Sequence, residues 1–444
     1  MTPGVARRDG EGAAAPRRAT RLTAPLFARL VAALARSLEL DRPADKLLSD
    51  YFRAHPGLGQ TDRALVAETV YAVLRRRRLL EHRGAGAEPR RLALAALVLL
   101  GGYSVRAVAG VAAPAELRWL EALRGAERGR LPFAVACDLP DWIVERLRAA
   151  YPEDELLALA RSLQGTAPLD LRVNAGRADR DAVLAALLAD GIAASPTPYS
   201  PLGIRVAGRP PLNRHRLFLD GLIEVQDEAS QLVCLLVGAR RGEMVADFCA
   251  GAGGKSLALA AAMRSTGRVY AFDVSERRLD ELKPRLARSG LSNVHPQRIA
   301  SERDPRLQRL ARKIDRVLVD APCSGLGTLR RNPDLKWRQS PESVAEMTRK
   351  QSAILAAAAA LTRPGGRLVY ATCSLLSEEN EAIVDAFLAA HPAYRAVPAR
   401  AALAAQGIEV PPVRAHAAHG EHLWLLPHVH GTDGFFAALL ERAA

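Results

Sequence analysis

The 444-residue sequence has few cysteines and no long apolar segment. Its five cysteines are too few, and odd in number, for a disulfide framework, which indicates a reducing compartment. No two of them have the close spacing of zinc ligands, so no metal site is expected. The longest apolar stretch, residues 92–100, is far shorter than the roughly 18 residues of a membrane span. We therefore expect a cytoplasmic protein without membrane segments, acting as a monomer.

Acidic residues are the minority charge, with 48 Asp and Glu against 62 Lys and Arg and a net charge of +14. Residues 1–150 contain 25 basic and 16 acidic side chains, so the excess is greatest in this first third. A basic chain favours a polyanionic partner, most often nucleic acid. A proteome rich in Ala and Arg would produce the same excess, so charge alone leaves the partner open.

The first half of the chain divides into three regions by its periodicity. Residues 1–22 contain mainly Ala, Gly, Arg and Pro and predict a disordered tail. Residues 23–138 repeat apolar side chains every three or four positions, which predicts an all-helical domain. Residues 139–223 begin with a helical connector and then change to short strands near 169–174 and 203–206, which predicts a small α/β subdomain.

Residues 224–444 alternate apolar strands with helices. Strands are expected at 244–248, 269–272, 317–320 and 367–371, and a helix follows each of the four. This alternation predicts an α/β fold with a doubly wound, mostly parallel sheet. Ligands of such sheets bind beyond the carboxyl ends of the strands, so the residues that follow each strand are the candidate site.

The first of these strands leads into a glycine-rich loop, DFCAGAGGKS at residues 247–256. A Walker loop fails because Cys249 replaces its first glycine, and a dinucleotide fingerprint fails because Ser256 replaces its third. The pattern Asp-x-Cys-x-Gly-x-Gly instead matches enzymes that bind S-adenosylmethionine. Asp273, which ends the second strand, has the spacing of an acid that hydrogen-bonds ribose hydroxyls. The alternative for Asp273 is a helix N-cap.

Two further strand ends contain cysteines, Cys323 in DAPCSG and Cys373 in TCS. A cysteine is usually a small buried residue, but two beside one ligand site indicate thiol chemistry. A thiolate that adds to carbon 6 of cytosine makes carbon 5 nucleophilic toward a methyl sulfonium, and a base must then remove the carbon-5 proton. Asp320 is placed as an acid near ring nitrogen 3, and Lys255 is a candidate cation for lowering the thiol pKa. These residues alone leave open which cysteine attacks.

The motifs CAGAGGKS, VDAPCSGLGTLRRNPDLKW, ATCSLLSEEN and HGTDGFF resemble those of the bacterial RsmB/Sun (Fmu, NOP/Sun) family of RNA 5-methylcytosine methyltransferases, over roughly residues 139–442. The resemblance implies a Rossmann-like methyltransferase domain that uses S-adenosylmethionine to methylate cytosine in RNA, and in 16S ribosomal RNA above all. It implies Cys373 as nucleophile, Cys323 in product release and Asp320 as the motif acid. The implied cofactor contacts are Cys249, Ala250, Gly251, Ala252, Gly253, Gly254, Lys255, Asp273 and Asp320. The family's usual acid near the adenine is missing, and Ser301 could replace it with a weaker contact.

Two groups of basic residues are expected to bind RNA. The helical region resembles the NusB-like RNA-binding domain of RsmB proteins, and its run Arg75, Arg76, Arg77 and Arg78 could contact phosphates. The alternative for this run is a solvated helix end favoured by the macrodipole. The second group, Arg330, Arg331, Lys336 and Arg338, lies beside Cys323 in the sequence.

Two other functions compete with this assignment. One is a catalytically silent RNA-binding or ribosome-assembly factor with the same fold, against which the intact cysteines and acids argue. The other is methylation at an exocyclic nitrogen, whose usual motif differs from Asp320-Ala321-Pro322-Cys323 and needs no second thiol.

Overall fold

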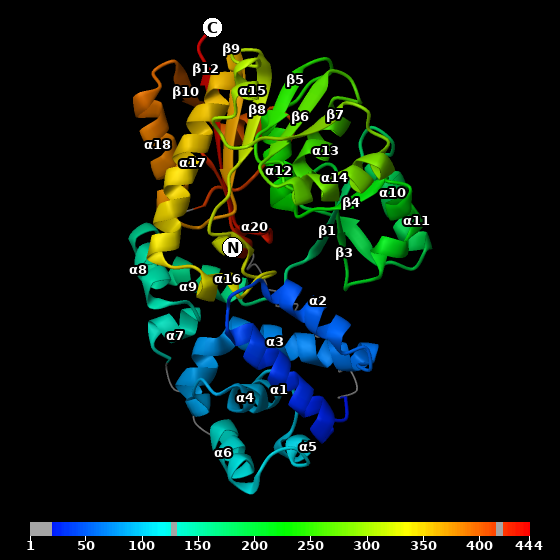
Figure 1. The fold of residues 1–444 in the computed structure, drawn as a ribbon, viewed down its shortest axis with the longest axis vertical. Coiled ribbons are helices and arrows are strands. Elements are labelled where there is room, and N and C mark those ends of the chain that lie inside the picture. The colour runs from blue at the N-terminus through cyan, green and yellow to red at the C-terminus, as the bar shows by residue number, and fades with distance from the viewer. Residues whose placement is uncertain (1–19, 126–130, 414–420) are drawn as a thin grey trace, which may run out of the picture. The chain divides into compact units, whose positions relative to one another are not determined.

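The computed structural model describes residues 20–125, 131–413 and 421–444 (Figure 1). The chain forms two compact units, residues 1–130 and 131–444. The tail expected over residues 1–22 lies outside the described residues except for its last three positions. Among the residues described, no helix has both the length and the apolar character of a membrane span.

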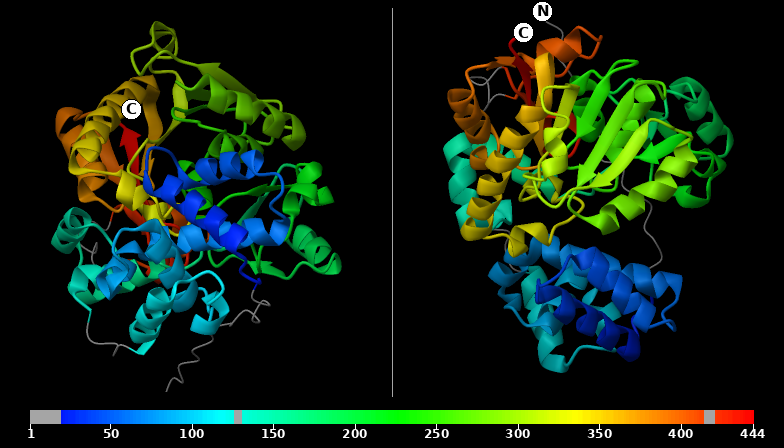
Figure 2. Two further views of the ribbon diagram at one scale, coloured as in Figure 1. Left: turned by 60° about the horizontal axis from the view of Figure 1, so that its bottom comes forward. Right: turned by 45° about the horizontal axis from the view of Figure 1, so that its top comes forward.

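The first unit is helical throughout its described residues, as the apolar spacing predicts. Its first helix, α1 (Ala24–Leu38), begins after Thr23, whose side chain accepts a hydrogen bond from the Leu26 amide. Leu30 and Leu34 of this helix are completely buried, and α1 packs against α3 and α4 (blue in Figure 2). The remaining elements are α2 (Ala44–Ala54), α3 (Gln60–Leu80), the π turn η1 (Glu81–Ala85), α4 (Pro89–Leu99), α5 (Val105–Val108) and α6 (Pro114–Gly125).

The arginine run at residues 75–78 lies within a helix. Helix α3 continues through it to Leu80 and passes directly into η1, with a kink at Arg76, where φ is −119° and ψ is 24°. All four arginines are half-buried, and Arg77 Nε lies 2.7 Å from Glu81 Oε1. Because Arg77 and Arg78 lie in the last turn of α3, the alternative of a helix end favoured by the macrodipole stays open. The phosphate-binding role remains a prediction.

The second unit begins with three helices and a small antiparallel sheet. The helices are α7 (Phe133–Cys137), α8 (Asp141–Ala150) and α9 (Glu153–Leu163). The side chain of Gln164 stabilises the end of α7, because its Nε2 donates hydrogen bonds to the carbonyls of Ala136 and Cys137. The sheet has the order β2-β3-β1-β4 and packs against α10 and α11. Its elements are β1 (Leu169–Val173), α10 (Arg180–Ala189), β2 (Ala194–Pro196), β3 (Gly203–Val206), η2 (Leu212–Arg214), α11 (Arg216–Leu219) and β4 (Ile223–Val225).

The rest of the second unit is built on a larger sheet of order β10-β12-β9-β8-β5-β6-β7, with β11 paired to β12. Strands β5 to β9 are parallel, and β12 adds antiparallel to β9. This is the doubly wound, mostly parallel sheet that the alternation predicts. The strands are β5 (Met244–Asp247), β6 (Arg268–Asp273), β7 (Val294–Arg298), β8 (Ile314–Asp320), β9 (Thr362–Thr372), β10 (Tyr394–Val397), β11 (Leu423–Leu425) and β12 (Phe435–Arg442).

Helices cover both faces of this sheet, so its central strands are buried on two sides. Along β8, Val317 and Val319 pack in one core with Leu355 of α17, whereas Leu318 packs in the other core with Leu232 of α12. The helical elements are α12 (Glu228–Val237), α13 (Gly254–Ala262), α14 (Glu276–Ser289), α15 (Pro305–Gln308), η3 (Leu326–Thr328), α16 (Leu335–Arg338), α17 (Pro341–Leu361), η4 (Ser377–Glu379), α18 (Glu381–Ala390), α19 (Ala399–Ala404) and α20 (Pro427–His430). Because parallel strands end at one edge, the residues after β5, β6, β8 and β9 meet there.

Candidate active site

The glycine-rich loop at residues 249–255 joins β5 to α13. Gly251 and Gly253 have φ values of +55° and +79°, which side chains other than glycine rarely adopt. A Cβ at Gly253 would lie 2.1 Å from Leu282 of α14, so the loop passes close to that helix. The Gly251 amide donates a 2.8 Å hydrogen bond to Asp273 Oδ2 at the end of β6. This hydrogen bond therefore connects the glycine-rich loop to the end of β6.

Asp273 is buried at the carboxyl end of β6, where the sequence predicts the ribose acid. Its Oδ1 accepts a 2.7 Å hydrogen bond from the Ser275 amide. The N-cap of α14 is Ser275, whose hydroxyl accepts from the Arg278 amide. The alternative in which Asp273 is itself the N-cap is therefore wrong, and its carboxylate instead joins the glycine loop to the start of α14.

Asp247, which ends β5, received no role from the sequence although it ends a strand as Asp273 and Asp320 do. It is completely buried, and Ser256 Oγ donates to its Oδ2 at 2.7 Å. Its Oδ1 has no hydrogen-bond partner among the described residues, and burial raises its pKa to about 7. A buried acceptor without a partner beside a glycine loop is suited to a ligand that brings hydrogen-bond donors or positive charge.

Lys255 forms an ion pair with Asp320, the residue that ends β8. Its Nζ lies 2.7 Å from Asp320 Oδ2 and 5.3 Å from the centre of the Phe435 ring. Burial alone would lower the pKa of Lys255, but the charge and hydrogen bond of Asp320, together with the nearby Cys234 and Asp247, outweigh it, and the pKa is raised. The positive charge of Lys255 is therefore paired with the carboxylate of Asp320. No hydrogen bond from Lys255 to either strand-end cysteine is among the described contacts.

Cys323 and Cys373 lie side by side at the ends of the adjacent strands β8 and β9. Their Sγ atoms are 3.4 Å apart, and both residues are partly exposed. The hydrogen bond with Cys373, together with burial, raises the pKa of the Cys323 thiol well above its usual value. By contrast, Cys234 is buried in α12, and burial raises its pKa to about 12. The two predicted cysteines thus lie in contact with each other, at the edge of the sheet that carries the glycine loop.

Ser301 lies in the loop after β7, at the same edge of the sheet. Its hydroxyl accepts a 3.2 Å hydrogen bond from the Arg303 amide. Two acids follow Ser301 in this loop. Glu302 lies 3.5 Å from Arg303, and Asp304 is buried and accepts hydrogen bonds from the Ala300 amide and from Arg306. Asp304 is thus engaged within its own loop, and Ser301 remains the predicted cofactor contact here.

The basic residues after Cys323 are paired within the protein. Arg330, 7% exposed, contacts Asp433 at 3.2 Å, and Arg331 lies 2.5 Å from Asp433 and 2.8 Å from Asp227. Because a buried guanidinium paired with a carboxylate is not available to a phosphate, the RNA-binding prediction is corrected for Arg330. The prediction is also corrected for Lys336, which is 3% exposed and donates a hydrogen bond to the carbonyl of Asp138. Arg338 forms an ion pair with Asp334 at 3.5 Å.

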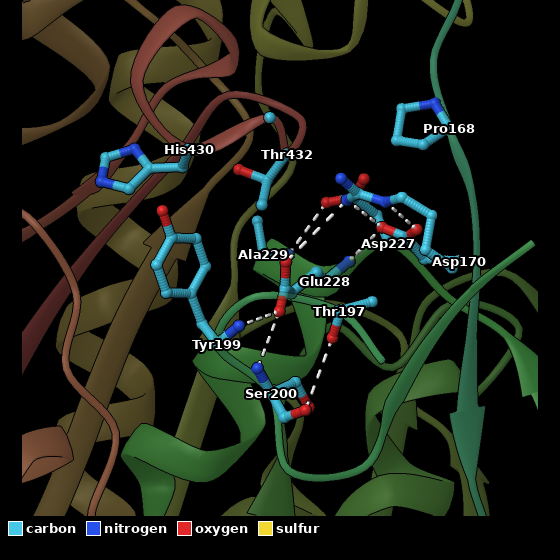
Figure 3. Close-up of polar contacts among 12 residues, drawn as sticks. Pro168, Asp170, Thr197, Tyr199, Ser200, Asp227, Glu228, Ala229, His430 and Thr432 are labelled. Atoms are coloured by element: carbon cyan, nitrogen blue, oxygen red, sulfur yellow. Dashed lines mark hydrogen bonds and ion pairs between the residues drawn. The ribbon is translucent and has the colours of Figure 1, made fainter. Parts of the chain in front are cut away.

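A buried acidic cluster joins the small subdomain to the larger sheet (Figure 3). Glu228, at the start of α12, is completely buried and accepts hydrogen bonds from the amides of Tyr199 and Ser200 at 2.6 and 2.7 Å. Asp170 of β1 pairs with Arg205 of β3 at 2.8 Å, and the Glu228 amide donates to the same Asp170. These contacts fix the subdomain beside the loop that follows Cys323.

Two family models match the second unit. One, described as 16S rRNA methyltransferase RsmB/F, matches residues 234–441. The other, described as the ferredoxin-like domain of RsmF/B-like methyltransferases, matches residues 139–213.

Curated relatives extend the likeness over most of the chain. The probable ribosomal RNA small subunit methyltransferase B of Synechocystis sp. is 31% identical in an alignment of 439 positions that covers 91% of this chain and 96% of that protein. The ribosomal RNA small subunit methyltransferase B of Salmonella arizonae is 35% identical over 301 residues, which are 68% of this chain and 66% of that protein.

Solved structures share the fold. The crystal structure of PH0851 matches with a TM-score of 0.75 at 26% identity, over 95% of this chain and 100% of that one. NSun6 from Pyrococcus horikoshii, solved with SFG, matches with a TM-score of 0.61 at 20% identity, over 69% of this chain and 98% of that one. Given the matched family model and the 31% identity to the Synechocystis relative over 96% of its length, the chain belongs to the RsmB/F family of 16S rRNA methyltransferases.

Proposed function

We propose that this protein methylates carbon 5 of a cytosine in 16S ribosomal RNA, with S-adenosylmethionine as methyl donor. The observation that carries the proposal is the 3.4 Å separation of the Cys323 and Cys373 Sγ atoms beside the glycine loop. A cytosine ring needs a thiolate at carbon 6 before carbon 5 can accept a methyl group, and a second group must remove the carbon-5 proton. Membership of a 16S rRNA methyltransferase family supports the substrate.

The edge formed by β5 and β6 fits S-adenosylmethionine. The unpartnered Oδ1 of Asp247 offers an acceptor to a cationic ligand, and the positive φ of Gly251 and Gly253 keeps side chains out of the loop. The residues that would hold the cofactor are those of the loop, 249–255, together with Asp247, Asp273 and Ser301. When bound, the cofactor supplies an electrophilic methyl group on a sulfonium.

The pKa of Cys323 supports Cys373 as the nucleophile. A thiolate attacks and a thiol does not, and the raised pKa keeps Cys323 protonated at neutral pH. In this assignment the Cys373 thiolate bonds to carbon 6 and carbon 5 bonds to the methyl group. The Lys255 ammonium, 2.7 Å from Asp320, can pass a proton through that carboxylate toward ring nitrogen 3.

Formation of the adduct prepares Cys323 for the release step. The hydrogen bond and the charge of Cys373 contribute to the raised pKa of Cys323, and both change once the Cys373 sulfur is bonded to carbon. The pKa of Cys323 then falls, its proton leaves to solvent, and its thiolate takes the proton from carbon 5. The carbon–sulfur bond breaks, the ring double bond returns, and Cys373 is a thiolate again. Ring nitrogen 3 gives its proton back through Asp320 to Lys255. The net reaction releases one proton for each methyl group.

The first unit is proposed to bind RNA. Residues 23–138 would be the NusB-like RNA-binding domain, residues 139–223 the connector and small subdomain, and residues 224–444 the catalytic domain. The basic excess of residues 1–150 supports this division, because phosphate contacts supply much of the affinity for RNA.

The test is 16S rRNA methylation by four purified proteins, read by bisulfite sequencing and by nucleoside mass spectrometry. Cys373→Ala should abolish transfer but still bind S-adenosylmethionine, and Cys323→Ala should accumulate a covalent enzyme–RNA adduct on denaturing gels. Cys137→Ala, which removes a buried cysteine of α7, is the matched control beside the unaltered protein. Normal turnover by Cys373→Ala overturns the nucleophile assignment.

Two other results would redirect the assignment. N4-methylcytidine in place of 5-methylcytidine would support transfer to an exocyclic nitrogen. A protein that binds RNA but neither binds S-adenosylmethionine nor methylates RNA would be a silent assembly factor.

A further inference from the structure

A single carboxylate, that of Glu379, contacts the loops of both strand-end cysteines. We propose that Glu379 is a positioning residue that holds Cys323 and Cys373 in contact, so that the two thiols can act in one reaction cycle. The inference rests on the proposed function. Glu379 lies in the motif ATCSLLSEEN, but the sequence assigns it no role.

Glu379 is completely buried at the end of η4, and its two oxygens accept four hydrogen bonds. Oε1 accepts from the Ser324 amide at 2.8 Å and from Gln351 Nε2 at 3.0 Å. Oε2 accepts from the hydroxyls of Ser324 and Ser374, each at 2.5 Å. Because Ser324 follows Cys323 and Ser374 follows Cys373, the carboxylate joins the two cysteine loops directly.

The contacts of Glu379 extend to the other side of each cysteine. Gln351 Nε2 also donates to the carbonyl of Pro322, at 2.8 Å, so Cys323 is fixed through the residues before and after it. The neighbouring Asn380 accepts from Thr372 Oγ1 at 2.5 Å and donates to the Ser374 carbonyl at 3.2 Å. Cys373 is therefore also held on both sides.

The η4 turn is itself anchored to the sheet, so the carboxylate cannot easily follow a moving loop. The Tyr370 hydroxyl of β9 donates a 2.7 Å hydrogen bond to the Glu379 carbonyl. In addition, the Gly327 amide donates to the Cys373 carbonyl at 2.8 Å, which links the two cysteine loops through the backbone. The spacing of the two sulfurs thus depends on a fixed acceptor with donors from both loops.

A carboxylate side chain suits this arrangement. Two of its partners, the Ser324 amide and Gln351 Nε2, can only donate, and both carboxylate oxygens can accept. A glutamine at this position would replace one oxygen with an NH2 group, which cannot accept the hydrogen bonds that this oxygen accepts. The loops would then separate or turn, and a misplacement of about 1 Å near reacting atoms costs on the order of 100-fold in rate.

The chain offers matched variants for a test. Glu379→Gln removes one acceptor, and Glu379→Asp keeps the charge on a shorter side chain. Glu381→Gln is the control, because Glu381 is also buried, is two residues further on, and its Oε2 has no hydrogen-bond partner among the described residues. If Glu379→Gln does not fold, Ser374→Ala removes one of the same hydrogen bonds with a smaller change.

The first measurement reports the position of the thiols without using activity. Diamide oxidises two neighbouring thiols to a disulfide and is itself reduced to the hydrazine, and the Cys323–Cys373 link is quantified by peptide mass spectrometry. At a temperature where both proteins are folded, Glu379→Gln should form this link about 10- to 100-fold more slowly than the unaltered protein, with an unchanged S-adenosylmethionine affinity. Glu381→Gln should crosslink at the rate of the unaltered protein, and Glu379→Asp at an intermediate rate.

The second measurement is single-turnover methylation with and without Cys323. Glu379→Gln should slow transfer and raise the fraction of covalent adduct, whereas in a Cys323→Ala background it should change adduct release little further. Crosslinking by Glu379→Gln at the unaltered rate overturns the inference, as does a loss of activity explained by loss of folded protein. If the unaltered protein makes no 5-methylcytidine, the proposed function fails, while the crosslinking result still decides the position of the thiols.

Discussion

Lys255 Nζ lies 2.7 Å from Asp320 Oδ2, and this pair links the glycine loop to the strand that leads to Cys323. The sequence places both residues beside the site but does not pair them. Because the ammonium is bound to a carboxylate, its effect on the reaction acts through Asp320. The pair connects the cofactor side of the site with the side where the base is expected.

Lys255→Met should lower the single-turnover rate of methylation by about 100- to 1000-fold, because Asp320 loses its cationic partner and proton donor. Lys255→Arg, which keeps the charge, should lose less. Lys283→Met removes a largely exposed lysine and is the control. A rate for Lys255→Met equal to that of the control would show that the pair has no part in transfer.

Replacing Asp247 with asparagine should make the free energy of unfolding depend less on pH. Burial raises the pKa of Asp247 from 3.8 to about 7, so the folded state binds this proton more tightly than the unfolded state. The free energy of unfolding therefore falls as the pH rises from about 4 to about 7 and is level above that range. Three pKa units correspond to at most about 4 kcal/mol. Urea unfolding at both ends of this pH range measures the change in the free energy of unfolding. An equal pH dependence of the variant and the unaltered protein would contradict the prediction.

Arg330→Ala should destabilise the protein rather than weaken a phosphate contact. Arg330 is 7% exposed and pairs with the buried Asp433, and removal of one partner of a buried ion pair costs about 3–5 kcal/mol. Arg303→Ala, whose arginine side chain is 87% exposed, should change stability by less than about 0.5 kcal/mol. The salt dependence of RNA binding should stay the same in Arg330→Ala. A slope reduced by about one with normal stability would instead identify a phosphate contact.

The strands that frame the site could be predicted because each is a short apolar run followed by a turn. The expected strands at 244–248, 269–272, 317–320 and 367–371 correspond to β5, β6, β8 and β9. The edge strand β7 has the sequence VHPQR, of which only the first residue is apolar and buried, so it carries no apolar pattern. Strand β12, FFAALLER, is a continuous apolar run whose first two residues belong to the motif HGTDGFF.

The sequence by itself determined which residues share an edge of the sheet. Parallel strands buried on both faces are continuous apolar runs, and their ends must align, so Asp273, Asp320, Cys323 and Cys373 were expected together. Only the tertiary structure decided which of these side chains touch and what the others do. Arg331 pairs with Asp227, which is 104 positions away, and Glu379 joins two loops that are 50 residues apart. Local periodicity reports only neighbours within a few residues, whereas buried ion pairs and shared hydrogen-bond acceptors depend on segments brought together by the fold.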